Sequence, residues 1–155
     1  MFETILVPTD GSEHALEAAE DAITLADEHG ASLHVLSVAD SGPLGRIRLP
    51  GEAGSPDEVL GDRAQRFVDE IVDRAEDAGV EATGNVEHGP PPSTILDYAR
   101  EIDADLIVMG SRGQGGLHRM AVGSVADHVI RFGGRRVLVV DTDGDDAEDD
   151  AHRGR

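Results

Sequence analysis

Cysteine and lysine are both absent from this chain of 155 residues. Without cysteine there is no disulfide, thiolate zinc site, iron-sulfur cluster or cysteine nucleophile. Without lysine, Schiff-base chemistry, a lysine general base and the phosphate loop GxxxxGK[ST] are excluded. Aromatic residues make up only 3% of the chain, with no tryptophan. The stacking surfaces typical of a flavodoxin-like electron carrier are therefore missing.

Long apolar runs and positive charge are also scarce. No stretch approaches the ~20 apolar residues that cross a bilayer, and no basic, apolar leader follows Met1, so we expect a cytoplasmic protein without a membrane partner. The chain has 32 acidic residues against 13 arginines, a net charge of -19. Such a surface repels phosphate backbones, which argues against nucleic acid as a partner. The acidity is typical of halophilic proteins, whose charges are screened over ~3 Å in 1 M salt.

Apolar runs that predict strands alternate along the chain with periodic segments that predict helices. We expect strands at residues 3–8, 32–38, 80–86, 106–109 and 137–140. Helices are expected from Ser12 to Gly30 and at residues 56–78, 93–102 and 122–132. The second helix has a clear start, because Ser55-Pro56-Asp57-Glu58 combines a capping serine, a proline at the first helical position and an acidic capping-box residue.

This alternation implies right-handed crossovers between parallel strands, hence a Rossmann-like α/β fold. We predict one five-stranded parallel open sheet of order 3-2-1-4-5 with helices on both faces. The length suits a single domain, which we assign to residues 1–141. We expect a mobile loop at residues 39–54 and a disordered acidic tail at residues 142–155.

Two loops rich in glycine and small polar residues follow the first and fourth strands. They are Thr9 to Ser12 and Gly110 to Gly116. In an open parallel sheet, ligands bind beyond the carboxyl ends of the strands where the strand order reverses. Unshielded amides in the second loop and the start of the next helix would suit phosphate, although a simple glycine turn is the alternative.

The spacing of four residues gives the second loop a more specific meaning. Gly110, Gly113 and Gly123-Ser124 fit the pattern G-x2-G-x9-G-[ST]. Together with Pro8 to Ser12 after the first strand, Val38 closing the second, Val108 to Gly110 in the fourth and Val137 to Val140 in the fifth, this pattern resembles the ATP-binding branch of the universal stress protein family. The Gly-Pro-Pro-Pro run at residues 89–92 is richer in proline than the family's pattern.

The resemblance implies a Rossmann-like fold similar to the adenine nucleotide alpha hydrolases. It also implies a bound adenine nucleotide, most simply ATP with Mg²⁺, a homodimer and a role in stress tolerance or signalling. It assigns Pro8, Thr9, Asp10 and Val38 to the adenosine side. It assigns Met109 to the closed end of the pocket. The residues it gives to the phosphates are Gly110, Gly113, Gly123 and Ser124, with Val125 at the start of the helix beneath them.

For several side chains the sequence allows two interpretations. Asp10 either binds ribose hydroxyls or Mg²⁺ through water, or stabilises the dipole of the first helix. Ser12 is a helix cap or a nucleophile, and Arg112 contacts a γ-phosphate or pairs with a surface acid. The seven histidines show no metal-binding spacing, and we interpret them as surface or packing residues.

The function we predict is an ATP-binding regulatory module for the stress response. The alternatives are a slow ATPase or adenylyl-transferring enzyme on the same site, and an adaptor whose site is empty. No evident general base argues against an enzyme. The fifth strand, Val137 to Val140, is wholly apolar yet would form a sheet edge, which predicts a homodimer through this strand.

Overall fold

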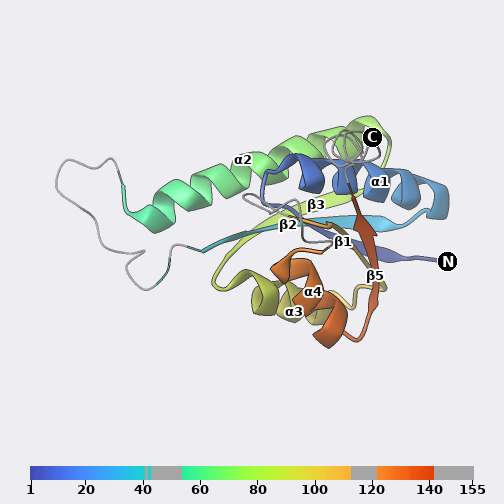
Figure 1. Cartoon of the computed structure of the whole chain (residues 1–155). Coiled ribbons are helices and arrows are strands. Elements are labelled where there is room, and N and C mark those ends of the chain that lie inside the picture. Colours follow the sequence, from blue (N-terminus) through green and yellow to red (C-terminus); the bar gives the residue numbers. More distant parts are fainter. Residues whose placement is uncertain (41, 43–53, 113–121, 142–155) are drawn as a thin grey trace, which may run out of the picture.

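The computed structural model describes residues 1–40, 42, 54–112 and 122–141 (Figure 1). Gly113, most of the 39–54 loop and the 142–155 tail lie outside the described residues. The strands are β1 (Thr4–Pro8), β2 (Ser32–Ala39), β3 (Ala82–His88), β4 (Leu106–Gly110) and β5 (Arg136–Val140). The described helices are α1 (Glu13–His29), α2 (Pro56–Asp77), α3 (Pro91–Glu101) and α4 (Ser124–Phe132).

The five strands form one parallel sheet of order β3-β2-β1-β4-β5, which confirms the predicted topology. β1 lies in the centre, with Ile5 paired to Leu33 of β2 on one side and to Leu106 of β4 on the other. The strand order therefore reverses between β1 and β4. Their carboxyl ends, Pro8 and Gly110, belong to the same edge of the sheet, which we call the carboxyl edge.

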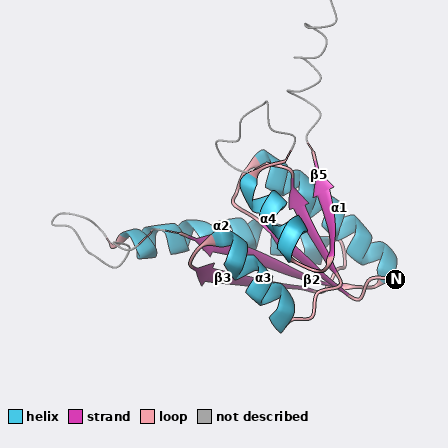
Figure 2. Cartoon of the chain, turned by 60° about the horizontal axis from the view of Figure 1, so that its bottom comes forward, coloured by secondary structure: helices cyan, strands magenta, loops and turns pink. Residues whose placement is uncertain are grey.

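Helices cover both faces of the sheet, as predicted. α1 and α2 lie on one face, and α3 and α4 lie on the other (Figures 1 and 2). Because successive strand residues point to opposite faces, neighbouring residues of β1 enter different cores. Ile5 and Val7 pack in the core beneath α1 and α2, whereas Leu6 packs in the core beneath α3 and α4. All three are fully buried.

The two long helices begin at the serine caps expected from the sequence. The hydroxyl of Ser12 accepts a hydrogen bond from the Ala15 amide (3.2 Å), and that of Ser55 accepts one from the Glu58 amide (3.3 Å). α1 ends at His29 and is capped by Gly30, whose φ of 65° lies in the left-handed region that glycine adopts without strain. The cap role predicted for Ser12 is confirmed.

Three elements have boundaries that differ from the sequence prediction by two residues. β3 spans residues 82–88 rather than 80–86, because the Val80 amide still bonds to the Ala75 carbonyl at the end of α2. α3 begins at Pro91, since proline lacks the amide hydrogen that a first helical residue leaves unused. α4 begins at Ser124 rather than Val122, because Gly123 is extended (φ -71°, ψ 166°).

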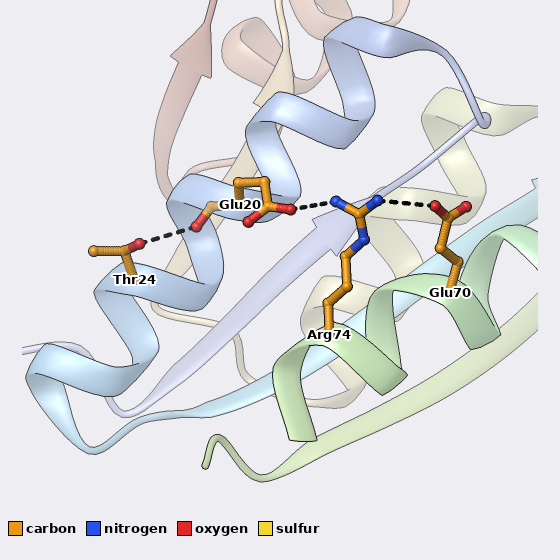
Figure 3. A network of polar contacts seen from close by, with 4 residues as sticks. All are labelled: Glu20, Thr24, Glu70 and Arg74. Carbon is orange, nitrogen blue, oxygen red and sulfur yellow. Dashed lines mark hydrogen bonds and ion pairs between the residues drawn. The ribbon is translucent and has the colours of Figure 1, made fainter. Parts of the chain in front are cut away.

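A surface network joins the two helices of one face (Figure 3). The Arg74 guanidinium of α2 bonds to Glu20 of α1 and, at 3.1 Å, to Glu70 one turn earlier in α2. The Thr24 hydroxyl donates to the Glu20 carbonyl at 3.1 Å. Because these side chains are half exposed, water screens both ion pairs and they contribute little to stability. None of the described helices combines the length and apolarity needed to cross a membrane.

Candidate functional site

The loop after β1 is held to the sheet by its own backbone. The Thr9 amide bonds to the Leu36 carbonyl of β2 at 2.8 Å, and the Thr9 side chain is buried. Its hydroxyl accepts a hydrogen bond from the Gly11 amide at 3.2 Å. Pro8 is buried at the end of β1. This loop is therefore a rigid turn at the carboxyl edge.

Asp10 is exposed at the same turn. One of its carboxylate oxygens, Oδ1, accepts the Ser12 amide at 3.0 Å. A carboxylate at the start of α1 stabilises the helix dipole. The structure thus supports the helix-terminus role of Asp10, and its role toward ribose or Mg²⁺ stays a prediction.

Gly110 is where β4 meets α1. A Cβ atom on Gly110 would lie 2.8 Å from the backbone carbonyl carbon of His14 and 2.9 Å from its oxygen. Only glycine fits so close to a backbone, and the contact brings the end of β4 against the first turn of α1. This packing requirement was not apparent from the glycine spacing.

Gly123 ties the start of α4 to the residues after β4. Its amide bonds to the Ser111 carbonyl at 2.5 Å, and a Cβ here would lie 3.1 Å from that oxygen. Gly123 is the N-cap of α4 and has no side chain with which to bond the first amides of the helix. Ser124 is exposed and Val125 half buried in that first turn. The positive end of the α4 dipole therefore lies at the carboxyl edge.

Arg112 pairs with an exposed acid, as one of its two interpretations held, but the guanidinium itself is buried. Its side chain is 5% exposed, and Nη2 lies 3.2 Å from Oδ1 of Asp141, just after β5. The Ser111 hydroxyl donates to the same oxygen at 2.9 Å. The Ser111 hydrogen bond and the Arg112 guanidinium lower the pKa of Asp141. Sequence reasoning missed Ser111 and Asp141, since nothing local marks a pair 29 or 30 residues apart.

Val38 and Met109 lie on the face of the sheet that α3 and α4 cover. Met109 is 5% exposed in the core of that face, and half-buried Val38 packs against the same cluster. Val38 is paired with Glu87 of β3, near the carboxyl ends of both strands. The resemblance thus names two apolar residues that share one face close to this edge.

α2 contributes two residues that the sequence analysis did not single out for the site. Gly11 has a φ of +81°, and a Cβ there would collide with the ring of Phe67. The Arg63 guanidinium lies over that ring, 5.9 Å from its centre. The only sequence signal was the place of Phe67 on the apolar face of the helix. Together they bring an aromatic ring and a positive charge beside the Thr9–Ser12 turn.

A depression of about 500 Å³ lies at the opposite, amino edge of the sheet, away from every residue predicted for the site. Its polar groups already bond to one another. Asp105 accepts the Glu3 amide at 2.8 Å, and Arg135 donates to the Ala104 carbonyl at 2.6 Å and to Asp103 at 3.2 Å. The polar groups of this depression therefore bond to one another where the strands begin. Among the described residues, no group of three histidine or acidic side chains could hold a metal ion.

A parallel sheet of this order, with two polar turns meeting at its carboxyl edge, defines the class of doubly wound Rossmann-like proteins. Residues 1–149 match the model of the universal stress protein family. The chain is 36% identical over 140 residues to the universal stress protein MJ0531 of Methanocaldococcus jannaschii, covering 90% of this chain and 82% of that one. The chain therefore belongs to the universal stress protein family.

Solved structures agree with this assignment. The hypothetical protein MJ0577 superposes with a TM-score of 0.81 at 28% identity, covering 92% of this chain and 97% of its own. A universal stress protein in complex with cAMP superposes with a TM-score of 0.67 at 27% identity, covering 90% and 97%. The universal stress protein of Archaeoglobus fulgidus in complex with dAMP gives 0.67 at 26% identity, covering 89% and 97%.

Proposed function

We propose that this protein is a regulatory module of the stress response that binds ATP at the carboxyl edge of its sheet, beyond β1 and β4. The observation that carries the proposal is the bond from the Gly123 amide to the Ser111 carbonyl, which joins the start of α4 to the end of β4. It brings a helix N-terminus to a loop that follows a strand, a combination suited to phosphate. Relatives solved with cAMP and dAMP support an adenine nucleotide as the ligand.

The proposed roles follow the family resemblance. Pro8, Thr9, Asp10 and Val38 contact adenosine, and Met109 closes the inner end of the site. Gly110, Gly113, Gly123 and Ser124 surround the phosphates, Val125 begins the helix behind them, and Arg112 belongs to the same loop. Gly113 lies outside the described residues. Asp10, exposed at the edge, is the acidic residue we propose for Mg²⁺, through a water molecule.

The assembly and setting we propose are a cytoplasmic homodimer at high salt. β5 is the last strand in the sheet order, so one side of its backbone has no neighbour in the described sheet. Val137, Val139 and Val140 are half buried and Leu138 is exposed, which leaves apolar surface along this edge. Pairing with the β5 of a second copy would cover both the apolar surface and the edge amides.

Binding is tested by calorimetry with ATP in about 2 M KCl, where the acidic surface is screened. Replacing Gly123 with valine places a side chain against the backbone of Ser111 and Arg112, at the start of the helix proposed to hold the phosphates. We expect a loss of about 30-fold to 150-fold in affinity. Gly61→Ala in the interior of α2, where a Cβ meets only His88 at 3.4 Å, is the control. Equal affinity in Gly123→Val and the parent would refute the site.

A slow ATPase is the second candidate, and the site makes it the weaker one. The described part of the edge offers amides and arginines, and its carboxylates are already engaged: Asp10 accepts the Ser12 amide, and Asp141 accepts the Ser111 hydroxyl and the Arg112 guanidinium. Carboxylates bound in this way are poor general bases. We therefore expect phosphate release well below ~1 per second. Faster release from the purified parent, lost in Gly123→Val, would establish an enzyme instead.

A further inference from the structure

One carboxylate oxygen at the end of β5 binds two buried side chains of the loop after β4. Oδ1 of Asp141 accepts the Ser111 hydroxyl at 2.9 Å and the Arg112 guanidinium at 3.2 Å. Ser111 and Arg112 are only 1% and 6% exposed, whereas half of the Asp141 side chain is exposed. Removing the carboxylate from a buried guanidinium is costly, so this contact strongly constrains Ser111 and Arg112.

The backbone of Ser111 connects the same contact to the rest of the site. Its amide bonds to the Val140 carbonyl at 2.9 Å, and its carbonyl accepts the Gly123 amide at 2.5 Å. Ser111 therefore joins β4, β5 and the start of α4. Any change that moves Ser111 also moves the Gly123 amide and the first turn of α4.

We propose that Asp141 is a positioning residue for the phosphate half of the site. Its carboxylate holds the side chains of Ser111 and Arg112, the two residues that follow β4, and this contact fixes Gly123 and the start of α4 in place. The part of this inference that concerns phosphate rests on the proposed function. The part that concerns the loop rests only on the contacts above.

Asp141 can either weaken or strengthen nucleotide binding, and the burial of Arg112 decides between these two alternatives. If the guanidinium were at the surface, Asp141 would compete with phosphates for it, and removing the carboxylate would strengthen binding. With Arg112 buried and paired, its charge is already neutralised by Asp141. The carboxylate then supports binding through the geometry of the loop, and removing it weakens binding.

Hydrogen exchange tests the positioning without any nucleotide. Asp141→Asn keeps an oxygen that can accept the Ser111 hydroxyl and removes the charge that holds Arg112. We expect the Ser111 and Gly123 amides to exchange about tenfold faster in this variant, with the central strand β1 unchanged. The matched control is Asp103→Asn, which removes an aspartate that also pairs with one arginine at 3.2 Å, but at the amino edge. Unchanged exchange at both amides would overturn the proposal.

Calorimetry then tests the consequence for the ligand, using ATP and adenosine on the same preparations. In Asp141→Asn we expect ATP to bind about tenfold more weakly and adenosine to change less than about twofold, because only ATP uses the phosphate half. Asp103→Asn should change neither. Tighter ATP binding in Asp141→Asn, or an equal loss for both ligands, would overturn the proposal.

Two further outcomes are distinguishable. If the parent binds no adenine nucleotide, the proposed function fails, and the exchange experiment still decides whether Asp141 positions the loop. If Asp141→Asn does not fold, Ser111→Ala replaces it, since this variant removes one of the two bonds and keeps the ion pair. A smaller change in the same direction is then expected, and no change would overturn the proposal.

Discussion

Replacing Gly110 with alanine is the sharpest test of how β4 meets α1. The backbone of Gly110 does not adopt a positive φ, so alanine introduces no conformational strain of its own. The added methyl group would lie 2.8–2.9 Å from the carbonyl carbon, carbonyl oxygen and Cβ of His14. These atoms belong to the first turn of a helix, or are fixed to it, so they move only if the helix shifts from the sheet.

The expected magnitude follows from two opposing effects. Overpacking a rigid contact costs about 1–3 kcal/mol, and backbone neighbours place Gly110 at the upper end. Because alanine lowers the conformational entropy of the unfolded chain, it stabilises the folded state by about 0.4–1 kcal/mol. We therefore expect Gly110→Ala to lower the free energy of unfolding by about 2 kcal/mol. For a chain of this length that corresponds to a melting temperature about 4–8 °C lower.

Gly61→Ala is the matched control, because it makes the same change inside α2. Its new Cβ would meet only the His88 ring, at an ordinary 3.4 Å, and alanine favours a helix over glycine by about 0.8–1 kcal/mol. The assay is urea unfolding of both variants in about 2 M KCl, followed by circular dichroism. If Gly110→Ala were within about 0.5 kcal/mol of Gly61→Ala, the close contact with His14 would not exist in solution.

Three other outcomes are expected. Val139→Pro removes an edge amide of β5 and should convert a dimer to monomer or aggregate in light scattering, and an unchanged dimer would put the interface elsewhere. Between ~0.1 and ~2 M KCl the melting temperature should rise, because salt screens the charge of -19 per chain, and a flat or falling curve would contradict the halophilic interpretation. Burial lowers the pKa of His34 from 6.5, although Glu81 opposes the shift. The neutral form of His34 therefore adds stability above pH 6.5, and this stability is lost as the pH falls through the lowered pKa. The melting temperature of His34→Gln should depend less on pH between pH 7 and 5 than that of the parent, and equal slopes for the two proteins would refute this assignment.

The parallel sheet could be predicted because strands and helices alternate along the chain, and this alternation implies crossovers between parallel strands. The ends of helices and strands were harder to predict where a single residue determines them. Gly123 is compatible with either a helix interior or an extended cap, and the bond to Ser111 that selects the cap joins residues 12 apart across the loop. The two-residue shift of β3 left its faces unchanged, since side chains alternate with a period of two.

The candidate site was predictable only as far as local spacing reaches. The turn after β1 and the cap at Ser12 depend on neighbouring residues, and both were anticipated. The burial of Arg112 depends on Asp141, and the place of Phe67 depends on how α2 lies against Gly11. Sequence spacing carries no signal for such contacts, because they arise only when distant elements pack.

The central place of β1 has a consequence for synthesis on the ribosome. Residues 1–88 contain β1, β2 and β3 with α1 and α2, and they complete the core of one face apart from the residues of β4 and β5. Leu6 and Leu36 belong to the other core, which also needs β4 and α4. Until those segments emerge, the nascent half-sheet exposes an apolar face and the open edge of its innermost strand. Its exposure to aggregation therefore lasts until α4, which ends at Phe132, has emerged from the ribosome.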